Sequence, residues 1–377
     1  MLKKRCCQYM DYRLGGENMS KQKVKVLHLL SSNKFSGAEN VVFQIINLFK
    51  DDNFDMVYSS KEGQIREACV KEKINFYPLK KINTKEVRKV IKEFQPDIIH
   101  AHDVKASVIA SFFSQNAQIV SHIHCNYEDM RIVNLKTLLF LLRAKKFEHI
   151  FWVSNSAFEK YRFNNKLKKK SSILYNVIDS EKIIAKSQDD LNHYNYDVVY
   201  LGRLSYPKNP ERLIDVLIKA IQIKKNLKMA IIGTGDLEEN VKNRAEKLGI
   251  QDNISFLGFQ SNPMKILKDA KVMLMTSRFE GTPMCALEAM ALGVPIVSTP
   301  IDGLVDIITD GVEGYLSEDN TKLAEKIVEI VEKKELHEEL SKNSIEKFSV
   351  INDLEKYKRI LLDVYYVQGE YTNEHIN

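Results

Sequence analysis

Short runs of apolar residues alternate along the chain with longer amphipathic stretches. Runs such as "VVYLG", "MAIIG" and "VMLMTS" are apolar without alternation, which is typical of strands covered on both faces. Strands that alternate with helices in this way indicate parallel, doubly wound sheets of the α/β class. We expect strands at 23–30, 55–60, 76–79, 97–102, 118–124, 149–154 and 172–178, and a second series at 198–204, 229–233, 254–258, 272–276, 295–298 and 314–316.

Two series of strands indicate two domains, which also suits a chain of 377 residues. A polar, weakly patterned stretch separates the two series. We therefore expect an N-terminal domain at 20–180, a linker at 181–196 and a C-terminal domain at 197–345. A final amphipathic helix is expected within 346–377, at Asp353–Gln368.

Composition indicates a soluble globular protein. Hydrophobic residues make up 44% and charged residues 28%, and no stretch reaches the roughly 18 apolar residues of a membrane span. The net charge of +6 is modest but uneven, with ten Lys or Arg and two acidic residues between Lys136 and Lys170. This pattern favours a local basic face over a nucleic-acid-binding protein.

The five cysteines lack zinc-type spacing and no signal peptide is visible, so we expect a cytoplasmic location, with Cys125 and Cys285 as small buried residues.

Three expected strand ends in the second half carry glycine. "YLGRLSYPKNP" places Gly202 at a strand end and then supplies Arg203 and Lys208 before a helix, an arrangement suited to a diphosphate. Solvated surface charges are the alternative. Gly233 in "IIGTGD" and Gly258 in "ISFLGF" are further strand ends where a ligand could approach the backbone. No GxGxxG pattern is completed, which disfavours dinucleotide binding.

The stretch "FEGTPMCALEAMALG" holds two glutamates on either side of a turn. Thr282 as N-cap and Pro283 as the first helical residue would start a helix that Gly293 ends. Glu280 then lies in the loop before the helix and Glu288 on its second turn. Carboxylates accept hydrogen bonds from hydroxyls, so the pair suits a hexose and a ribose beside a phosphate-binding turn. The alternative is a helix N-terminal charge and an unrelated surface residue.

These motifs together resemble retaining glycosyltransferase family 4. The resemblance lies in the order G-R-L, K-N, G-T-G, F-L-G and E-G-x-P with a second Glu eight residues after the first, and it covers 23–365. It implies the GT-B fold, two Rossmann-like doubly wound domains facing across a cleft. "SGAEN" resembles the family's Gly-Gly-x-Glu turn, with Ser36 in place of the first glycine. Asp306 stands where the family commonly has Glu, which puts a phosphate-side or ribose contact from that loop in doubt.

The resemblance implies roles for the second-domain residues. Arg203 and Lys208 would hold the diphosphate and stabilise the charge on the leaving group. Glu280 would contact hydroxyls of the donor sugar, and Glu288 the ribose. Backbone groups of the intervening turn would assist, and its residues are Gly281, Thr282, Pro283 and Met284.

In the first domain, the resemblance implies two site residues. Gly37 would let its turn approach the diphosphate, and His124, which ends the fifth strand, would lie near the donor sugar and acceptor. His100, His102 and His122 compete for the role of His124. We expect His122 to point away from His124 and to serve in packing.

The activity implied is transfer of a hexose-type sugar, with retention at the anomeric carbon and without metal or cofactor. We expect a UDP-sugar donor and a glycan or lipid-linked acceptor, in surface polysaccharide biosynthesis. Two alternatives are a GT-B nucleotide-sugar epimerase, which would turn over donor without acceptor, and a non-catalytic sugar-binding scaffold. Intact Arg203, Lys208, Glu280 and Glu288 argue against the scaffold.

The acceptor side is less informative. "NLKTLLFLLRAKK" combines an apolar run with basic flanks, and the basic residues continue to Lys170. The stretch 134–170 could contact the inner face of the cell membrane as a peripheral attachment. The plainer interpretation is an ordinary core helix with a solvated end.

Residues 1–19 look foreign to the fold, because they are polar, aperiodic and rich in Lys, Arg and Cys. "LGGENM" back-translates readily to a ribosome-binding site followed by a start codon. We expect Met19 to be the natural start. N-terminal sequencing of protein from the native host tests this, and a native peptide from 1–18 would contradict it.

Overall fold

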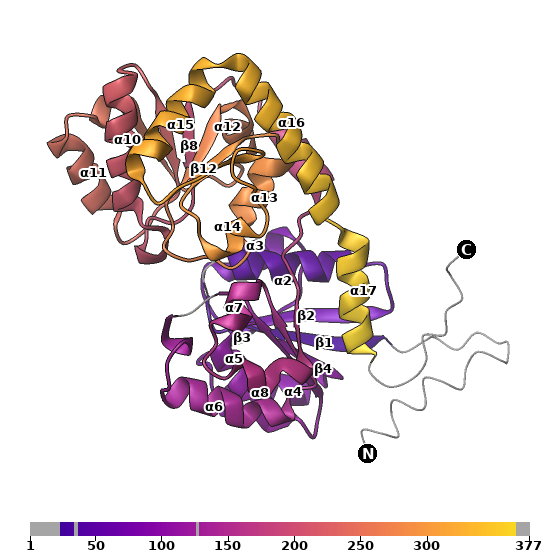
Figure 1. Ribbon diagram of the computed structural model, residues 1–377. Coiled ribbons are helices and arrows are strands. Elements are labelled where there is room, and N and C mark those ends of the chain that lie inside the picture. Colours follow the sequence, from indigo (N-terminus) through magenta and orange to yellow (C-terminus); the bar gives the residue numbers. More distant parts are fainter. Residues whose placement is uncertain (1–22, 34–36, 126–127, 367–377) are drawn as a thin grey trace. The chain divides into compact units, whose positions relative to one another are not determined.

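The computed structural model describes residues 23–33, 37–125 and 128–366 of the chain (Figure 1). The expected leader at 1–19 and Ser36 lie outside these residues. The chain divides into two units, one formed by 1–153, 157–174 and 355–377, and the other by 154–156 and 175–354.

The first unit holds a seven-stranded sheet in the order β3-β2-β1-β4-β5-β6-β7, and every pairing in it is parallel among the described residues. Its strands are β1 (Val24–Leu29), β2 (Phe54–Lys61), β3 (Phe76–Leu79), β4 (Ile98–Ala101), β5 (Gln118–Ile123), β6 (His149–Trp152) and β7 (Ser171–Ile173). Its helices are α2 (Gly37–Leu48), α3 (Ile65–Lys71), α4 (Thr84–Phe94), α5 (Val104–Ala110), α6 (Leu135–Arg143), α8 (Asn164–Leu167) and α17 (Leu354–Tyr365), and α7 (Asn155–Glu159) spans the division.

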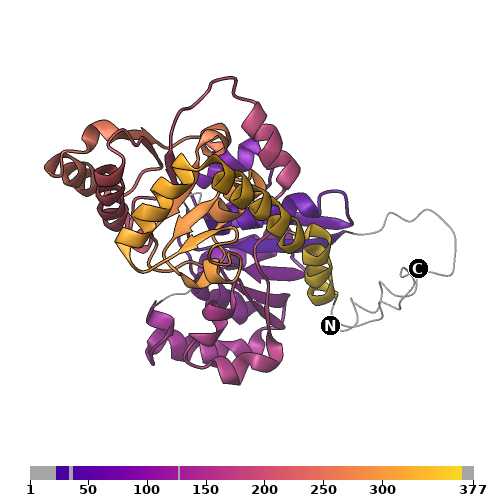
Figure 2. The ribbon, with the colours of Figure 1, turned by 45° about the horizontal axis from the view of Figure 1, so that its top comes forward.

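The second unit holds a six-stranded parallel sheet in the order β10-β9-β8-β11-β12-β13. Its strands are β8 (Val198–Leu201), β9 (Met229–Ile232), β10 (Ile254–Gly258), β11 (Val272–Met275), β12 (Ile296–Ser298) and β13 (Gly314–Leu316). Its helices are α9 (Ser180–Gln188), α10 (Pro210–Ile223), α11 (Glu238–Lys247), α12 (Met264–Asp269), α13 (Met284–Ala291), α14 (Asp302–Val305), α15 (Asn320–Glu332) and α16 (Lys334–Ile351). Helix α15 packs beside α10 and against β11, β12 and β13 (Figure 2).

All thirteen expected strands are present, and the α/β fold class is confirmed. Their apolar runs are buried as predicted: every residue of β4, β9 and β11 is buried. Several strands end earlier than the sequence predicts, and β8 stops at Leu201 instead of Leu204. Gly202 and Arg203 therefore lie in the loop beyond the strand, where parallel sheets place ligand-binding groups.

The stretch expected to link the domains is more ordered than its polar sequence predicts. Asp179 caps α9 by accepting a hydrogen bond from the Lys182 amide at 2.9 Å. Helix α9 then packs on α12 and α13 and belongs to the second unit. Burial of Ile183 and Ser187 against these helices supplies the order that the local pattern does not indicate.

The last helix, α17, groups with the first unit. Its Lys358 forms an ion pair with Asp52 at 2.7 Å, and the Val364 carbonyl accepts a hydrogen bond from Gln118 at 2.6 Å. The Tyr365 hydroxyl lies 2.7 Å from Nδ1 of His100. Three contacts with distant parts of the chain thus hold α17 in place.

Helix α6 differs from the plainer interpretation of its sequence as a core helix. A capping box between Asn134 and Thr137 starts it, but only Thr137 and Phe140 are buried along it. Leu141 packs partly buried against the core, but the other four leucines of the helix are exposed, and Leu135 reaches 81% exposure. In the described part of the chain, no helix combines the length and the apolar character that crossing a bilayer requires.

Candidate active site

The second unit gathers predicted site residues at the point where its strand order reverses. Strands β8, β9 and β10 run to one side, and β11, β12 and β13 to the other, so β8 and β11 are the neighbours at the switch. Lys208 follows β8, and Glu280 follows β11. Open parallel sheets bind ligands at such switch points, beyond the carboxyl ends of the strands.

An ion pair joins these two loops. Lys208 Nζ lies 2.5 Å from Glu280 Oε1, and the Ser277 hydroxyl donates to the same oxygen at 2.7 Å. The two charged side chains are only 19% and 13% exposed. Burial opposes the charge on Lys208, but the adjacent Glu280 carboxylate outweighs it and raises the pKa of Lys208 above its ordinary value. Lys208 therefore stays protonated, and the ion pair holds both side chains in place.

Arg203 differs from Lys208 in its surroundings. It is exposed, and it makes no side-chain hydrogen bond or ion pair with another described residue. The backbone beside it is fixed, because its carbonyl accepts a hydrogen bond from the buried Tyr200 hydroxyl at 2.8 Å. Arg203 thus presents an unpaired cation on a firmly held loop.

The helix after Glu280 begins one residue later than predicted. Pro283, in extended conformation, is the N-cap of α13, and Met284 is the first helical residue. Thr282 is buried and is not the cap; its carbonyl accepts a hydrogen bond from the Asn176 amide at 2.8 Å. The Met284 and Cys285 amides, at the start of α13, have no partner within the helix, whereas the Ala286 amide donates to the Pro283 carbonyl at 3.1 Å. Gly293 has φ +69°, the left-handed conformation expected after a helix end.

Glu288 is half-buried on the second turn of α13, as predicted. Burial raises the pKa of Glu288 to about 7, and the positive charges of Lys186 and Lys208 oppose this rise. The carboxyl is therefore present in both its neutral and charged forms near neutral pH. Cys285 lies in the same electrostatic neighbourhood, and burial raises the pKa of its thiol to about 12, so it stays protonated.

Two glycines of the second unit are required by backbone packing. A Cβ on Gly233, at φ +130°, would lie 2.0 Å from the Gly202 carbonyl oxygen. A Cβ on Gly303 would lie 1.3 Å from the carbonyl oxygen of Gly281. Gly258 has φ +62° with open space around its Cβ position, and its carbonyl accepts the Gly233 amide at 2.8 Å. These glycines bring the site loops together, whether or not they also touch a ligand.

Sequence reasoning missed three residues that shape this region. Gly303 lies in the "DGLVD" stretch, of which the resemblance concerns only Asp306. Asn176, in "ILYNVID", is buried and binds the Thr282 carbonyl. The neighbouring Tyr175 hydroxyl donates to Asp306 at 3.2 Å. Asn176 lies inside the strand predicted at 172–178, but β7 ends at Ile173, so Asn176 stands in the loop beyond it.

The first unit carries the other two predicted site residues. Gly37 is the first residue of α2 and is exposed. His124 follows β5, and its Nε2 lies 2.9 Å from Nδ1 of His102. Burial lowers the pKa of His124 to about 3, so its imidazole is neutral.

The expectation that His122 points away from His124 is wrong. Residues two apart on a strand share a face, and the two rings have centroids 4.0 Å apart. Of the competing histidines, His102 contacts His124 directly, and His100 is buried against Tyr365. His124 therefore ends a cluster of imidazoles.

Comparisons with known proteins agree with this geometry. The family described as "Glycosyltransferase Family 4" matches residues 35–182, and "Glycosyl transferases group 1" matches residues 181–347. Lipopolysaccharide 1,6-galactosyltransferase of Escherichia coli is 26% identical over 305 residues, covering 75% of this chain and 81% of that protein. N-acetyl-alpha-D-glucosaminyl L-malate synthase of Bacillus anthracis is 24% identical over 288 residues, covering 71% and 75%.

Among solved structures, that of Anabaena HepE in complex with UDP and glucose has a TM-score of 0.79 with 20% identity. It covers 90% of this chain and 98% of that one. This likeness shows the fold, and the two matched families together span residues 35–347. The chain is a glycosyltransferase of family 4, with the GT-B fold.

Proposed function

We propose that this enzyme moves a hexose-type sugar from a UDP-sugar to a glycan or lipid-linked acceptor, with retention at the anomeric carbon. The observation that carries the proposal is the ion pair between Lys208 and Glu280 at the switch point, beside the first turn of α13. A relative named as a galactosyltransferase and a fold neighbour solved with UDP and glucose support a nucleotide-sugar donor.

The two cations divide the work on the diphosphate. Lys208 is ion-paired with Glu280, whereas the Arg203 guanidinium has no ion-pair partner among the described residues and can pair with a phosphate. We assign Arg203 to direct binding of the diphosphate. Lys208 supports the phosphate more weakly and holds Glu280 in position through its ammonium group.

The two carboxylates bind hydroxyls. Glu280 is held by Lys208 and Ser277 through the same oxygen, Oε1, which orients its carboxylate toward donor-sugar hydroxyls ahead of the helix. The Met284 and Cys285 amides at the start of α13 favour the negative charge of the phosphates. Glu288 accepts from the ribose hydroxyls, and it does so best in its charged form.

The transfer step needs little covalent chemistry from the protein. The bond between the anomeric carbon and the β-phosphate oxygen breaks, and the nucleoside diphosphate leaves with the electron pair. The acceptor hydroxyl oxygen bonds to the same face of the anomeric carbon, and its proton passes to the leaving phosphate. Arg203 and Lys208 stabilise the charge that develops on that phosphate. In the first unit, Gly37 and His124 are our candidates for contacts to diphosphate and sugar.

We also propose that the first unit docks on an anionic lipid surface, at the inner face of the cell membrane. A lipid-facing patch surrounds α6, and its members are the exposed apolar residues Phe112, Ile132, Val133, Leu135, Leu138, Leu139 and Leu142. Arg143 lies 3.9 Å from the centre of the Phe112 ring, so the two parts of the patch adjoin. Ten Lys or Arg and two acidic residues follow between 136 and 170, which complements anionic headgroups.

Glu280→Gln tests the role of the carboxylate. Glutamine keeps an oxygen that Lys208 and Ser277 can donate to, so the fold should survive. We expect turnover to fall by about two orders of magnitude, the usual cost of losing one transition-state contact. Steady-state rates with a UDP-sugar check this, with Glu239→Gln, an exposed glutamate of the same unit, as the control. Turnover like wild type in Glu280→Gln would refute the assigned role.

Arg203→Ala tests diphosphate binding. Losing one charge-assisted hydrogen bond costs about 1.5–3 kcal/mol, which corresponds to a roughly tenfold to hundredfold weaker affinity for UDP. Titration calorimetry with UDP measures it, and Lys247→Ala, an exposed cation on α11, should bind UDP like wild type. An unchanged affinity in Arg203→Ala would remove this residue from the phosphate site.

The double substitution Leu135→Ser and Leu142→Ser tests membrane docking. These side chains are 81% and 63% exposed, so the fold should be unaffected. Each leucine buried in lipid contributes about 1.5–3 kcal/mol, so binding to anionic vesicles should fall at least tenfold. Vesicle flotation measures this, and the matched control is Leu191→Ser with Val350→Ser, two exposed apolar residues elsewhere. Equal flotation of both double variants would contradict the docking surface.

A further inference from the structure

Five imidazoles gather on one face of the first unit's sheet. The sheet has its own switch point between β1 and β4, where the strand order reverses. His28 on β1 pairs in register with His100 on β4, and His102 follows two residues later. His122 and His124 continue the cluster at the end of β5. His100 and His102 are two residues apart, as are His122 and His124, so the members of each pair lie on the same face of the sheet.

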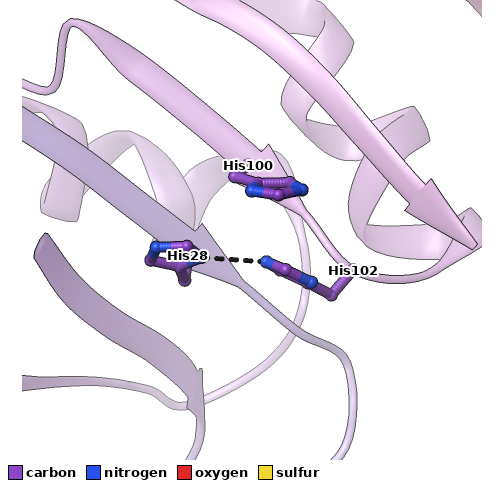
Figure 3. A group of neighbouring side chains, drawn as sticks. All are labelled: His28, His100 and His102. Carbon is purple, nitrogen blue, oxygen red and sulfur yellow. Dashed lines mark hydrogen bonds between the residues drawn. The ribbon is translucent and has the colours of Figure 1, made fainter. Parts of the chain in front are cut away.

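The first three of these rings are close enough to share one ligand. His28, His100 and His102 each offer a nitrogen, and these three atoms all lie within 4.8 Å of one another (Figure 3). Nδ1 of His28 lies 2.9 Å from Nε2 of His102. All three side chains are buried, at 0%, 0% and 1% exposure.

The hydrogen bonds among the imidazoles leave several ring nitrogens of this cluster without a partner. Five ring nitrogens are buried and have no partner among the described residues, and they are Nε2 of His28, Nε2 of His100, both nitrogens of His122 and Nδ1 of His124. A buried polar atom without a partner is unfavourable and uncommon in native proteins. The concentration of five such atoms at one place indicates that something besides the protein binds there.

We propose that His28, His100 and His102 bind one late first-row transition metal ion, of which Zn²⁺ is the representative. Imidazole nitrogen is the donor that Zn²⁺, Cu²⁺ and Ni²⁺ share, whereas Mg²⁺ and Ca²⁺ prefer oxygen. Bonds of about 2.0–2.1 Å in tetrahedral geometry place ligand nitrogens about 3.3 Å apart. Nδ1 of His28 and Nε2 of His102 lie 2.9 Å apart, and the nitrogens of all three histidines lie within 4.8 Å of one another. These separations span the value expected around one ion.

The hydrogen-bond partners of His100 and His102 are of the kind that orient metal-binding histidines. Metal-binding histidines usually hydrogen-bond through the second nitrogen, which orients the ring. Nδ1 of His100 lies 2.7 Å from the Tyr365 hydroxyl, and Nδ1 of His102 lies 2.9 Å from His124. His100 and His102 can therefore present Nε2 to the ion, and His28 presents Nδ1, which lies 2.9 Å from Nε2 of His102. In the competing group of His102, His122 and His124, two of the three rings lack an orienting contact, because neither nitrogen of His122 nor Nδ1 of His124 has a partner among the described residues.

The role that follows is structural and does not rest on the proposed transfer chemistry. His28 comes from β1, and His100 and His102 come from the end of β4, so the ion would tie these two central strands together. Through Tyr365, the same ion would position α17. A metal that binds the native state alone raises its stability by mass action.

Metal titration of the full chain tests the site. The protein is prepared without a histidine tag, stripped with a chelator and titrated with Zn²⁺ by calorimetry and with Co²⁺ by absorption, with Mg²⁺ as the negative control. We expect one saturable equivalent of Zn²⁺, Co²⁺ bands typical of tetrahedral nitrogen ligation, and a higher Tm with Zn²⁺ than without. No saturable Zn²⁺ binding by the wild type would overturn the proposal and leave bridging water as the partner of the orphan nitrogens.

Variants decide which histidines bind. Loss of an orienting contact lowers metal affinity by about 10–100-fold, and Tyr365→Phe should lower the Zn²⁺ affinity within that range. His28→Asn and His100→Asn should each lower the Zn²⁺ affinity by more. His149→Asn, a half-buried histidine bound to Ser172, is the matched control and should bind like wild type, as should His122→Asn. Circular dichroism checks the fold of each. The assignment would be overturned if both His28→Asn and His100→Asn bound Zn²⁺ with wild-type affinity. It would also be overturned if His122→Asn alone lost Zn²⁺ binding.

Discussion

Parallel pairing is the constraint on which both units depend. Within the described residues every strand pairing is parallel, so the carboxyl ends of each sheet meet at one edge. The strand order reverses between β8 and β11 in one unit and between β1 and β4 in the other. At these two places the loops diverge and leave room for a ligand. The carboxylate and ammonium of one unit and the imidazoles of the other lie at those places.

Close backbone approach then shapes the second unit's site. Gly202 and Gly233 bring the loops after β8 and β9 together, and Gly281 and Gly303 do the same for the loops before α13 and α14. A side chain at Gly233 or Gly303 would collide with a carbonyl oxygen of the facing loop. The glycine-rich character of the second half therefore serves the assembly of the loops that carry Arg203 and Glu280.

Electrostatics distinguishes residues that sequence alone treats alike. Arg203 and Lys208 read as two equivalent cations, but one is exposed and unpaired among the described residues and the other is bound to Glu280. Glu280 and Glu288 read as two equivalent carboxylates. Glu280 is ion-paired, whereas burial raises the pKa of Glu288 to about 7. Each member of each pair therefore has a different capacity to bind a charged donor.

The sequence by itself determined the strands, the fold class and the family, because unbroken apolar runs and the motif around Glu280 and Glu288 are local signals. It also predicted the end of α13 at Gly293, a local property of glycine. Only the tertiary structure decided that α9 packs as a helix, that α6 exposes most of its leucines, and that Lys208 pairs with Glu280 across 72 positions. The same holds for the histidine cluster, which joins residues from three strands and a helix far apart in the chain. Burial and long-range contact depend on how the elements pack, and no local pattern encodes them.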